Sequence, residues 1–138
     1  GYDEFFSGLD CLVMGARTYE QIREFGEWPY GDRPTYVFTN RALPRLAETV
    51  EFVEGDVGAV ATQLKRRYGH VWLVGGAQLL SSFLSENEVE ELRLSLVPIL
   101  LGSGIRLFPA GGARRRLRQL ESITHGTGIA ELRYDVVD

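Results

Sequence analysis

The sequence lacks the features that mark a secreted or membrane-spanning protein. Among 138 residues there is one cysteine, Cys11, so the chain has no internal disulfide. The apolar neighbours of Cys11 predict a buried thiol rather than a nucleophile. No apolar run reaches the roughly 20 residues of a membrane-spanning helix, and no secretory signal peptide is recognisable. We therefore expect a reducing, cytoplasmic compartment.

A basic excess is also missing. The formal net charge is −4, which argues against a nucleic-acid partner, because such proteins usually carry a clear positive balance. The two histidines, His70 and His125, have no partner at a metal-ligand spacing, so no metal site is predicted. Neither a Gly-x-Gly-x-x-Gly nor a Walker-type phosphate loop occurs. The length fits a single domain over residues 1–138.

The first half of the chain alternates strand and helix patterns, which indicates an α/β fold with a largely parallel sheet and helices on its faces. The predicted strands are Cys11–Met14, Tyr36–Thr39, Val50–Val53 and Val71–Val74; the predicted helices are Tyr2–Leu9, Tyr19–Phe25, Val57–Tyr68 and Ala77–Ser85. Asp56 is a suitable N-cap for the third helix.

The second half changes to strand patterns. Residues Glu91–Pro98 alternate polar and apolar side chains, as a half-exposed strand does. Two longer patterns, Ala113–Thr124 and Ile129–Val137, are joined by the turn-forming segment Gly126–Gly128. We expect an antiparallel C-terminal hairpin that completes a mixed sheet.

The stretch Val71–Leu80 organises the chain, because four apolar residues run into Gly75-Gly76 and then directly into a helical pattern. The apolar run predicts a strand buried on both faces. The glycines let a backbone or ligand approach closely, and the N–H groups at Gly76–Gln78 favour an anion such as phosphate. A tight strand-to-helix turn without a ligand is the other interpretation, and this stretch alone does not decide between them.

Three predicted strand ends reinforce the phosphate interpretation. Gly15–Thr18, Thr39–Arg41 and Gly75–Gln78 each follow a strand, and ligands of open α/β sheets bind outside the carboxyl ends of the strands. Together they supply two helix starts, two arginines and small polar side chains. Arg17 begins a helix, where its charge opposes the local dipole unless an anion is bound.

The sequence around these strand ends resembles the dihydrofolate reductase superfamily. The resemblance is carried by Val13–Glu20, Val37–Asn40 and Val74–Gly76. The tail Glu91–Phe108 is similar to the riboflavin-biosynthesis reductase branch, the C-terminal domain of the bifunctional deaminase-reductase. The resemblance covers nearly the whole chain. It implies a three-layer dihydrofolate reductase-like fold and a homodimer.

The resemblance also implies an NADPH site and a substrate pocket. The implied cofactor-binding residues are Gly15, Ala16, Arg17, Thr18, Thr39, Asn40, Arg41, Gly75, Gly76, Ala77 and Gln78; the implied substrate-binding residues are Gly102, Ser103 and Gly104. Dihydrofolate reductases usually carry Gly-Arg where this chain has Gly15-Ala16, with its arginine at position 17. This departure bears on the choice between NADPH and NADH.

In the family, the first strand and the carboxylate that faces the substrate precede the position of Gly1, so we expect an N-terminally incomplete domain without an assignable catalytic residue. Asp3 and Glu4 either face the pocket or stabilise a helix start.

The leading hypothesis is an NADPH-dependent reductase that transfers a hydride to a pterin or ribosylamino-pyrimidine-like molecule. A non-catalytic nucleotide- or pterin-binding dimeric protein is the alternative. Residues Leu92–Leu101 and the long C-terminal strands are candidates for pairing two subunits through an exposed edge.

Overall fold

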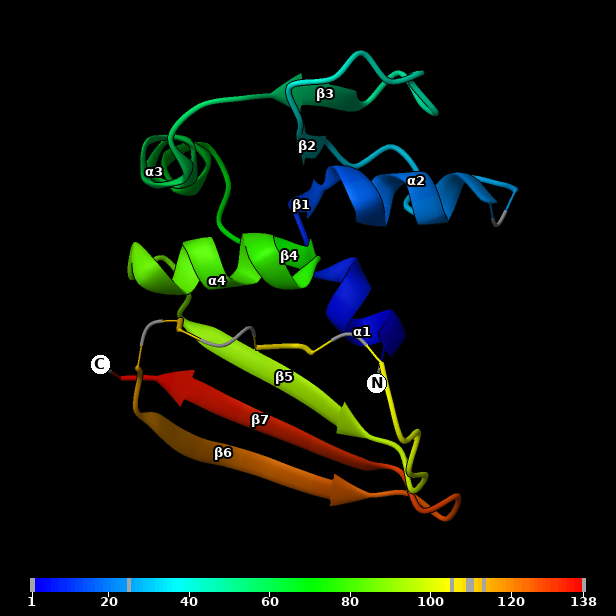
Figure 1. The fold of residues 1–138 in the computed structure, drawn as a ribbon, viewed down its shortest axis with the longest axis vertical. Coiled ribbons are helices and arrows are strands. Elements are labelled where there is room, and N and C mark those ends of the chain that lie inside the picture. The colour runs from blue at the N-terminus through cyan, green and yellow to red at the C-terminus, as the bar shows by residue number, and fades with distance from the viewer. Residues whose placement is uncertain (1, 25, 105, 109–110, 113, 138) are drawn as a thin grey trace.

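The computed structural model describes residues 2–24, 26–104, 106–108, 111–112 and 114–137, which form two sheets with helices around them (Figure 1). The helices are α1 (Tyr2–Ser7), α2 (Ala16–Glu24), α3 (Val57–Arg67) and α4 (Ala77–Ser85). The strands are β1 (Cys11–Gly15), β2 (Thr35–Phe38), β3 (Val50–Val53), β4 (Val71–Gly75), β5 (Glu91–Leu96), β6 (Leu117–Thr124) and β7 (Ala130–Val136).

The first sheet has four strands in the order β3-β2-β1-β4, and every neighbouring pair is parallel. Figure 1 shows α2 on one side of these strands and α3 on the other. Each face of the sheet buries its own apolar cluster. The helices α1 and α2 cover Leu12 and Met14, and α3 and α4 cover Cys11 and Val13. This confirms the predicted α/β layering.

Local sequence patterns predict the start or the cap of several elements to within a few residues. Asp56 caps α3 as predicted, because its carboxylate accepts the Ala59 N–H at 2.9 Å; such a cap contributes about 1 kcal/mol. The helix α2 begins at Ala16, three residues earlier than predicted, and its last predicted residue, Phe25, lies outside the described residues.

The second sheet is antiparallel, in the order β5-β7-β6. The predicted hairpin of β6 and β7 is confirmed, and the half-exposed strand is β5. The strand β6 begins at Leu117 rather than at Ala113, which itself lies outside the described residues. The hairpin pairs with β5 and not with the parallel sheet. Within the described residues there are thus two separate sheets in place of one continuous mixed sheet.

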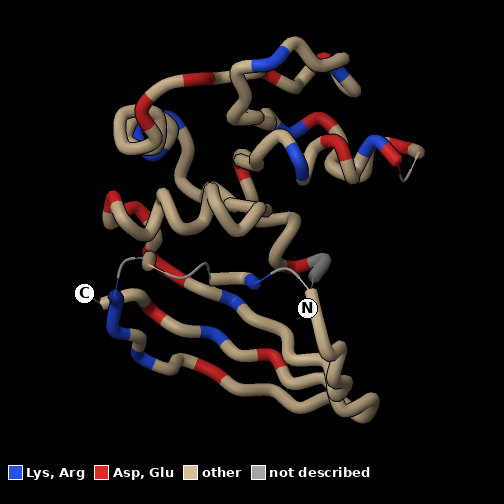
Figure 2. Tube along the Cα trace, viewed as in Figure 1, with Lys and Arg blue, Asp and Glu red and all other residues tan. Residues whose placement is uncertain are grey.

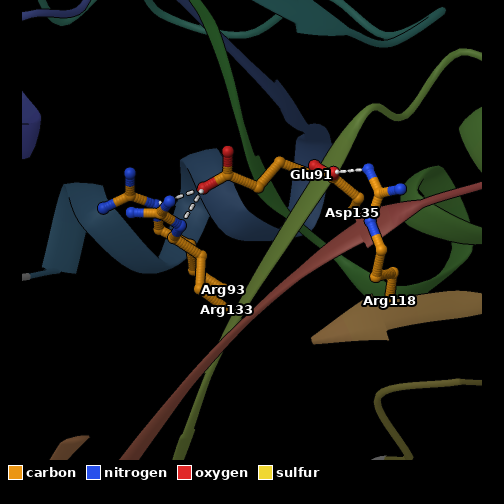
Figure 3. Close-up of polar contacts among 5 residues, drawn as sticks. All are labelled: Glu91, Arg93, Arg118, Arg133 and Asp135. Atoms are coloured by element: carbon orange, nitrogen blue, oxygen red, sulfur yellow. Dashed lines mark hydrogen bonds and ion pairs between the residues drawn. The ribbon is translucent and has the colours of Figure 1, made fainter. Parts of the chain in front are cut away.

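One face of the antiparallel sheet is charged. The Glu91 carboxylate accepts from Arg93 Nε at 2.9 Å and lies 3.3 Å from Arg133 Nε, while Arg118 pairs with Asp135 at 2.7 Å (Figure 3). Arg93 and Arg133 stand directly opposite each other on β5 and β7, where like charges repel. The shared carboxylate offsets that repulsion.

The prediction that Val71–Val74 is buried on both faces is wrong, because every residue of β4 is only half-buried. The reason lies in the strand order. In the described part of the chain, β4 is an edge strand of the parallel sheet and β5 is an edge strand of the antiparallel sheet. Both strands contact α1 through Phe5: its ring lies 5.2 Å from the Trp72 ring, and the Arg93 guanidinium lies 4.6 Å above it.

Basic and acidic residues alternate along the antiparallel sheet and α2, whereas the strands of the parallel sheet are nearly uncharged (Figure 2). Among the described residues, no helix is long and apolar enough to cross a membrane.

Candidate functional site

The carboxyl ends of three strands meet at one edge of the parallel sheet. The strand β1 lies in the middle, with Gly15 paired to Phe38 of β2 and Met14 paired to Gly75 of β4. The segments that follow these strands, 15–18, 39–41 and 75–78, are therefore neighbours. We call these three segments the strand-end cluster. The structure brings together all of the residues predicted to bind a cofactor.

The backbones of β1 and β4 approach closely within this cluster. A Cβ built on Gly15 would lie 3.7 Å from the Gly76 nitrogen, and a Cβ on Gly75 or Gly76 would lie 3.5 Å from the Thr18 hydroxyl oxygen. Gly75 has φ of 144°, a conformation that residues with a side chain rarely adopt. The Gly75–Gly76 peptide bond is cis. Three glycines thus present bare backbone beside the start of α2.

The helix α4 begins at this backbone without a side-chain cap. Gly76 is its N-cap residue and makes no side-chain hydrogen bond, and its carbonyl already accepts the Leu80 N–H at 2.9 Å. The amides at the start of a helix have no partner inside the helix. In a nine-residue helix they also carry the positive end of the dipole. This combination favours a bound phosphate.

Arg17 lies in the first turn of α2, and its side chain is exposed. Among the residues that the structure describes, it has neither a hydrogen-bond nor an ion-pair partner. A lone cation at a helix N-terminus is electrostatically unfavourable. A bound anion beside Arg17 would remove that cost.

The segment after β2 is held from both ends. The Thr39 N–H donates to the Val53 carbonyl at 2.9 Å, and the Thr39 hydroxyl accepts the Arg41 N–H at 3.0 Å. The Arg41 guanidinium forms an ion pair with the Glu20 carboxylate of α2. Sequence reasoning missed Glu20, because the two residues are 21 positions apart and no local motif joins them.

The predicted substrate-binding residues Gly102, Ser103 and Gly104 lie in an exposed segment after β5. Among the described residues, no hydrogen bond or ion pair joins them to the strand-end cluster. Of the two candidate carboxylates, Glu4 is exposed on α1, and the Asp3 side chain lies outside what the structure describes.

Two surface hollows lie away from the strand-end cluster. One, of about 330 Å³, is lined by residues including Asp56, Ser82 and Glu86. The other, of about 200 Å³, lies beside Tyr36, Arg67 and Tyr68. We place the candidate site at the strand ends because two helix starts and the positive charge of Arg17 meet there. The larger hollow includes the start of α3, but its charged residues, Asp56 and Glu86, are acidic, and the smaller hollow includes no helix start.

Two titratable groups outside the strand-end cluster, Cys11 and Lys65, have shifted pKa values that follow from burial and ion pairs. Burial raises the pKa of the Cys11 thiol to about 12, in line with the expected buried thiol. Burial lowers the pKa of Lys65, but hydrogen bonds to Glu88 and Glu90 outweigh this effect and raise it overall. No group of three or more metal-ligating side chains occurs among the described residues.

Comparison with known proteins identifies the family. The model of the RibD C-terminal domain matches residues 15–130, most of the chain and all three segments of the strand-end cluster. The chain belongs to the RibD C-terminal domain family.

Two Bacillus subtilis relatives are uncharacterised proteins. YwjB is 34% identical over 110 residues, which are 78% of this chain and 63% of YwjB. YyaP is 25% identical over 147 residues, with 97% of this chain and 78% of YyaP covered. The chain therefore spans less than two thirds of the length of YwjB.

Solved structures share the fold of this RibD C-terminal domain. A putative riboflavin biosynthesis protein from Shewanella sp. PV-4 has a TM-score of 0.88 at 23% identity, covering 100% of this chain and 80% of that one. A pyrimidine reductase-like protein from Corynebacterium diphtheriae has a TM-score of 0.71 at 16% identity, with 94% and 77% covered. Acinetobacter baumannii RibD has a TM-score of 0.67 at 18% identity, with 94% and 47% covered.

Proposed function

We propose that this RibD C-terminal domain is an NADPH-dependent reductase that acts on a pterin or a ribosylamino-pyrimidine-like molecule. One observation carries the proposal. The uncapped start of α4, the bare backbone of Gly15, Gly75 and Gly76, and the unpaired Arg17 lie together at the carboxyl edge of the sheet. That set suits a dinucleotide with more than one phosphate.

The residues of the strand-end cluster divide the work of binding. The amides of Gly76, Ala77 and Gln78 bind the pyrophosphate, and Arg17 with the Thr18 hydroxyl neutralises and orients it. A side chain at Gly15 or Gly75 would project toward the opposing backbone or Thr18 and occupy that space. The nicotinamide, when bound, supplies the hydride; the protein holds it in place.

The adenosine end of the cofactor lies at Thr39, Asn40 and Arg41. These residues follow β2, one strand away from β1, and Thr39 is fixed by its hydrogen bond to β3. The guanidinium of Arg41 suits a phosphate on the ribose, because arginine binds such groups with two parallel hydrogen bonds. We assign Gly102, Ser103 and Gly104 to the substrate side of the pocket, as the resemblance implies.

The family supports the proposed substrate class. The solved structures with this fold include proteins described as riboflavin biosynthesis and pyrimidine reductase-like, which supports a heterocyclic small molecule as the substrate.

The strand-end cluster contains no side chain that would transfer a proton to the substrate, because it has no aspartate, glutamate, histidine or cysteine. The same observation favours a second candidate function, a nucleotide- or pterin-binding protein without turnover.

We also propose that the protein is a homodimer. The segment after β5 exposes Val97, Ile99, Leu100 and Leu101, with Leu100 97% and Leu101 77% exposed. Contiguous apolar surface of this kind is typical of an interface. We assign the protein to the cytoplasm, where a lone buried thiol is stable.

Light scattering tests the dimer. The full-length protein should have twice the monomer mass. The substitution Leu100→Asp should reduce the mass to that of a monomer, because Leu100 is almost fully exposed and its replacement disturbs no packing within one chain. Glu54→Asp serves as a surface control. A monomeric wild type would contradict this part of the proposal.

The reductase is tested by titrating the full-length protein with NADPH and following the fluorescence of Trp28 and Trp72. Saturable quenching and oxidation of NADPH with a ribosylamino-pyrimidine or pterin are expected. Binding without oxidation would favour the second candidate function. No binding at millimolar NADPH would overturn both.

A further inference from the structure

The ion pair between Glu20 and Arg41 lies at the rim of the strand-end cluster. Glu20 is on α2, one turn after Arg17, and Arg41 follows β2. Their side chains are 42% and 55% exposed, so a ligand from solvent reaches both. The hydrogen bond from the Arg41 N–H to the Thr39 hydroxyl fixes the arginine backbone.

The two members of this pair have opposite preferences for a ribose substituent. A guanidinium binds a 2′-phosphate, whereas a carboxylate accepts a hydrogen bond from a free 2′-hydroxyl and repels a phosphate. NADPH and NADH differ in that substituent alone. The pair therefore places a group suited to each cofactor at the same point of the rim.

We propose that Glu20 is a specificity-determining residue that weakens the preference for NADPH over NADH. This inference rests on the proposed function, because it requires the adenosine ribose to lie at Thr39–Arg41. The ion pair uses one Arg41 nitrogen, Nη2, so a 2′-phosphate bound to this guanidinium lies close to the negative charge of Glu20.

The size of the effect follows from the charges. A carboxylate about 6 Å from a phosphate dianion in water weakens binding by about tenfold. Salt near 0.15 M reduces this to about threefold. Both side chains are exposed, so the effect of removing the carboxylate depends on ionic strength.

The experiment measures dissociation constants of NADPH, NADH, 2′,5′-ADP and 5′-AMP for the full-length protein and its variants. Glu20→Gln removes the charge and keeps the size of the side chain. It should tighten NADPH and 2′,5′-ADP by about three- to tenfold. It should not tighten NADH or 5′-AMP, because their free 2′-hydroxyl loses a charged acceptor. Arg41→Gln should weaken NADPH and 2′,5′-ADP and leave NADH nearly unchanged.

The matched control is Glu24→Gln, which removes an exposed carboxylate one turn further along α2. It should change none of the four constants by more than about twofold. The gain of Glu20→Gln should also shrink as salt rises from low to molar concentration.

The outcomes separate this inference from the proposed function. If wild type binds the nucleotides and Glu20→Gln leaves the NADPH to NADH ratio unchanged, or Glu24→Gln changes it equally, Glu20 does not set specificity, although the cofactor site stands. If neither dinucleotide binds at millimolar concentration, the proposed function and this inference are both overturned.

Discussion

The Tyr19 hydroxyl donates a hydrogen bond to the Pro44 carbonyl across 2.5 Å. The same oxygen accepts the Leu46 N–H at 2.7 Å. The Tyr19 side chain is buried in the core of the parallel sheet, and its hydroxyl therefore ties α2 to the loop that carries Arg41. One side chain thus links the helix that follows Gly15 to the loop that follows residues 39–41.

Tyr19→Phe should destabilise the protein by about 1–3 kcal/mol, because it leaves two part-buried backbone groups without their partner. It should also weaken NADPH binding by loosening the loop after β2. Urea unfolding and fluorescence titration measure the two effects. Tyr68→Phe is the matched control, since it also removes one hydroxyl contact, the 2.9 Å contact with Tyr36, but leaves that loop untouched. Equal NADPH affinities in all three proteins would contradict the role assigned to Tyr19.

Gly75→Ala should lower the free energy of unfolding by about 1–3 kcal/mol, because φ of 144° is costly for alanine. The cost does not come from crowding, as the added Cβ would lie at an ordinary contact distance of 3.5 Å from Thr18. Gly126→Ala is the control, with open space around its Cβ and no positive φ. Thermal unfolding of both variants tests this prediction, and equal stability of the two would contradict a conformation at Gly75 that only glycine adopts at low cost.

The Cys11 thiol should be inert in the folded protein. Burial raises its pKa from 9.0 to about 12, so the thiolate that reacts with alkylating reagents is scarce. We expect no labelling by iodoacetamide at pH 8 in buffer and full labelling in urea. Rapid labelling of the native protein would contradict the burial of β1.

The same shift predicts a pH dependence of stability. The raised pKa means that the folded state holds its proton more tightly than the unfolded state. This contribution is complete below about pH 9 and is lost as pH rises toward about 12. Cys11→Ala should flatten the fall in unfolding free energy over that range, and an unchanged slope would contradict the assignment to Cys11.

The elements that sequence predicts well are those with a complete local signal. The strand Val50–Val53 and the helix Ala77–Ser85 have the predicted bounds, because alternation, apolar spacing and glycine stops all act within a few residues. The capping role of Asp56 is equally local. The convergence of three strand ends was also predictable, since parallel strands joined by helices align their carboxyl ends.

Long-range relationships escaped prediction. The half-burial of Val71–Val74 depends on which strands flank β4, and the split into two sheets depends on the partner of β5. An apolar run indicates a buried strand but does not indicate its neighbours. The pairing of Glu20 with Arg41 depends on how α2 lies against the loop after β2. The features that the sequence did not predict all depend on contacts between elements that are distant in the sequence.

The central claim is that the strand-end cluster binds the cofactor. Hydrogen exchange of the full-length protein with and without saturating NADPH tests it most directly. We expect slower exchange at residues 15–18, 39–41 and 76–78, with residues 118–123 of β6 unchanged. Protection confined to other segments, or no change anywhere at a saturating concentration, would contradict it.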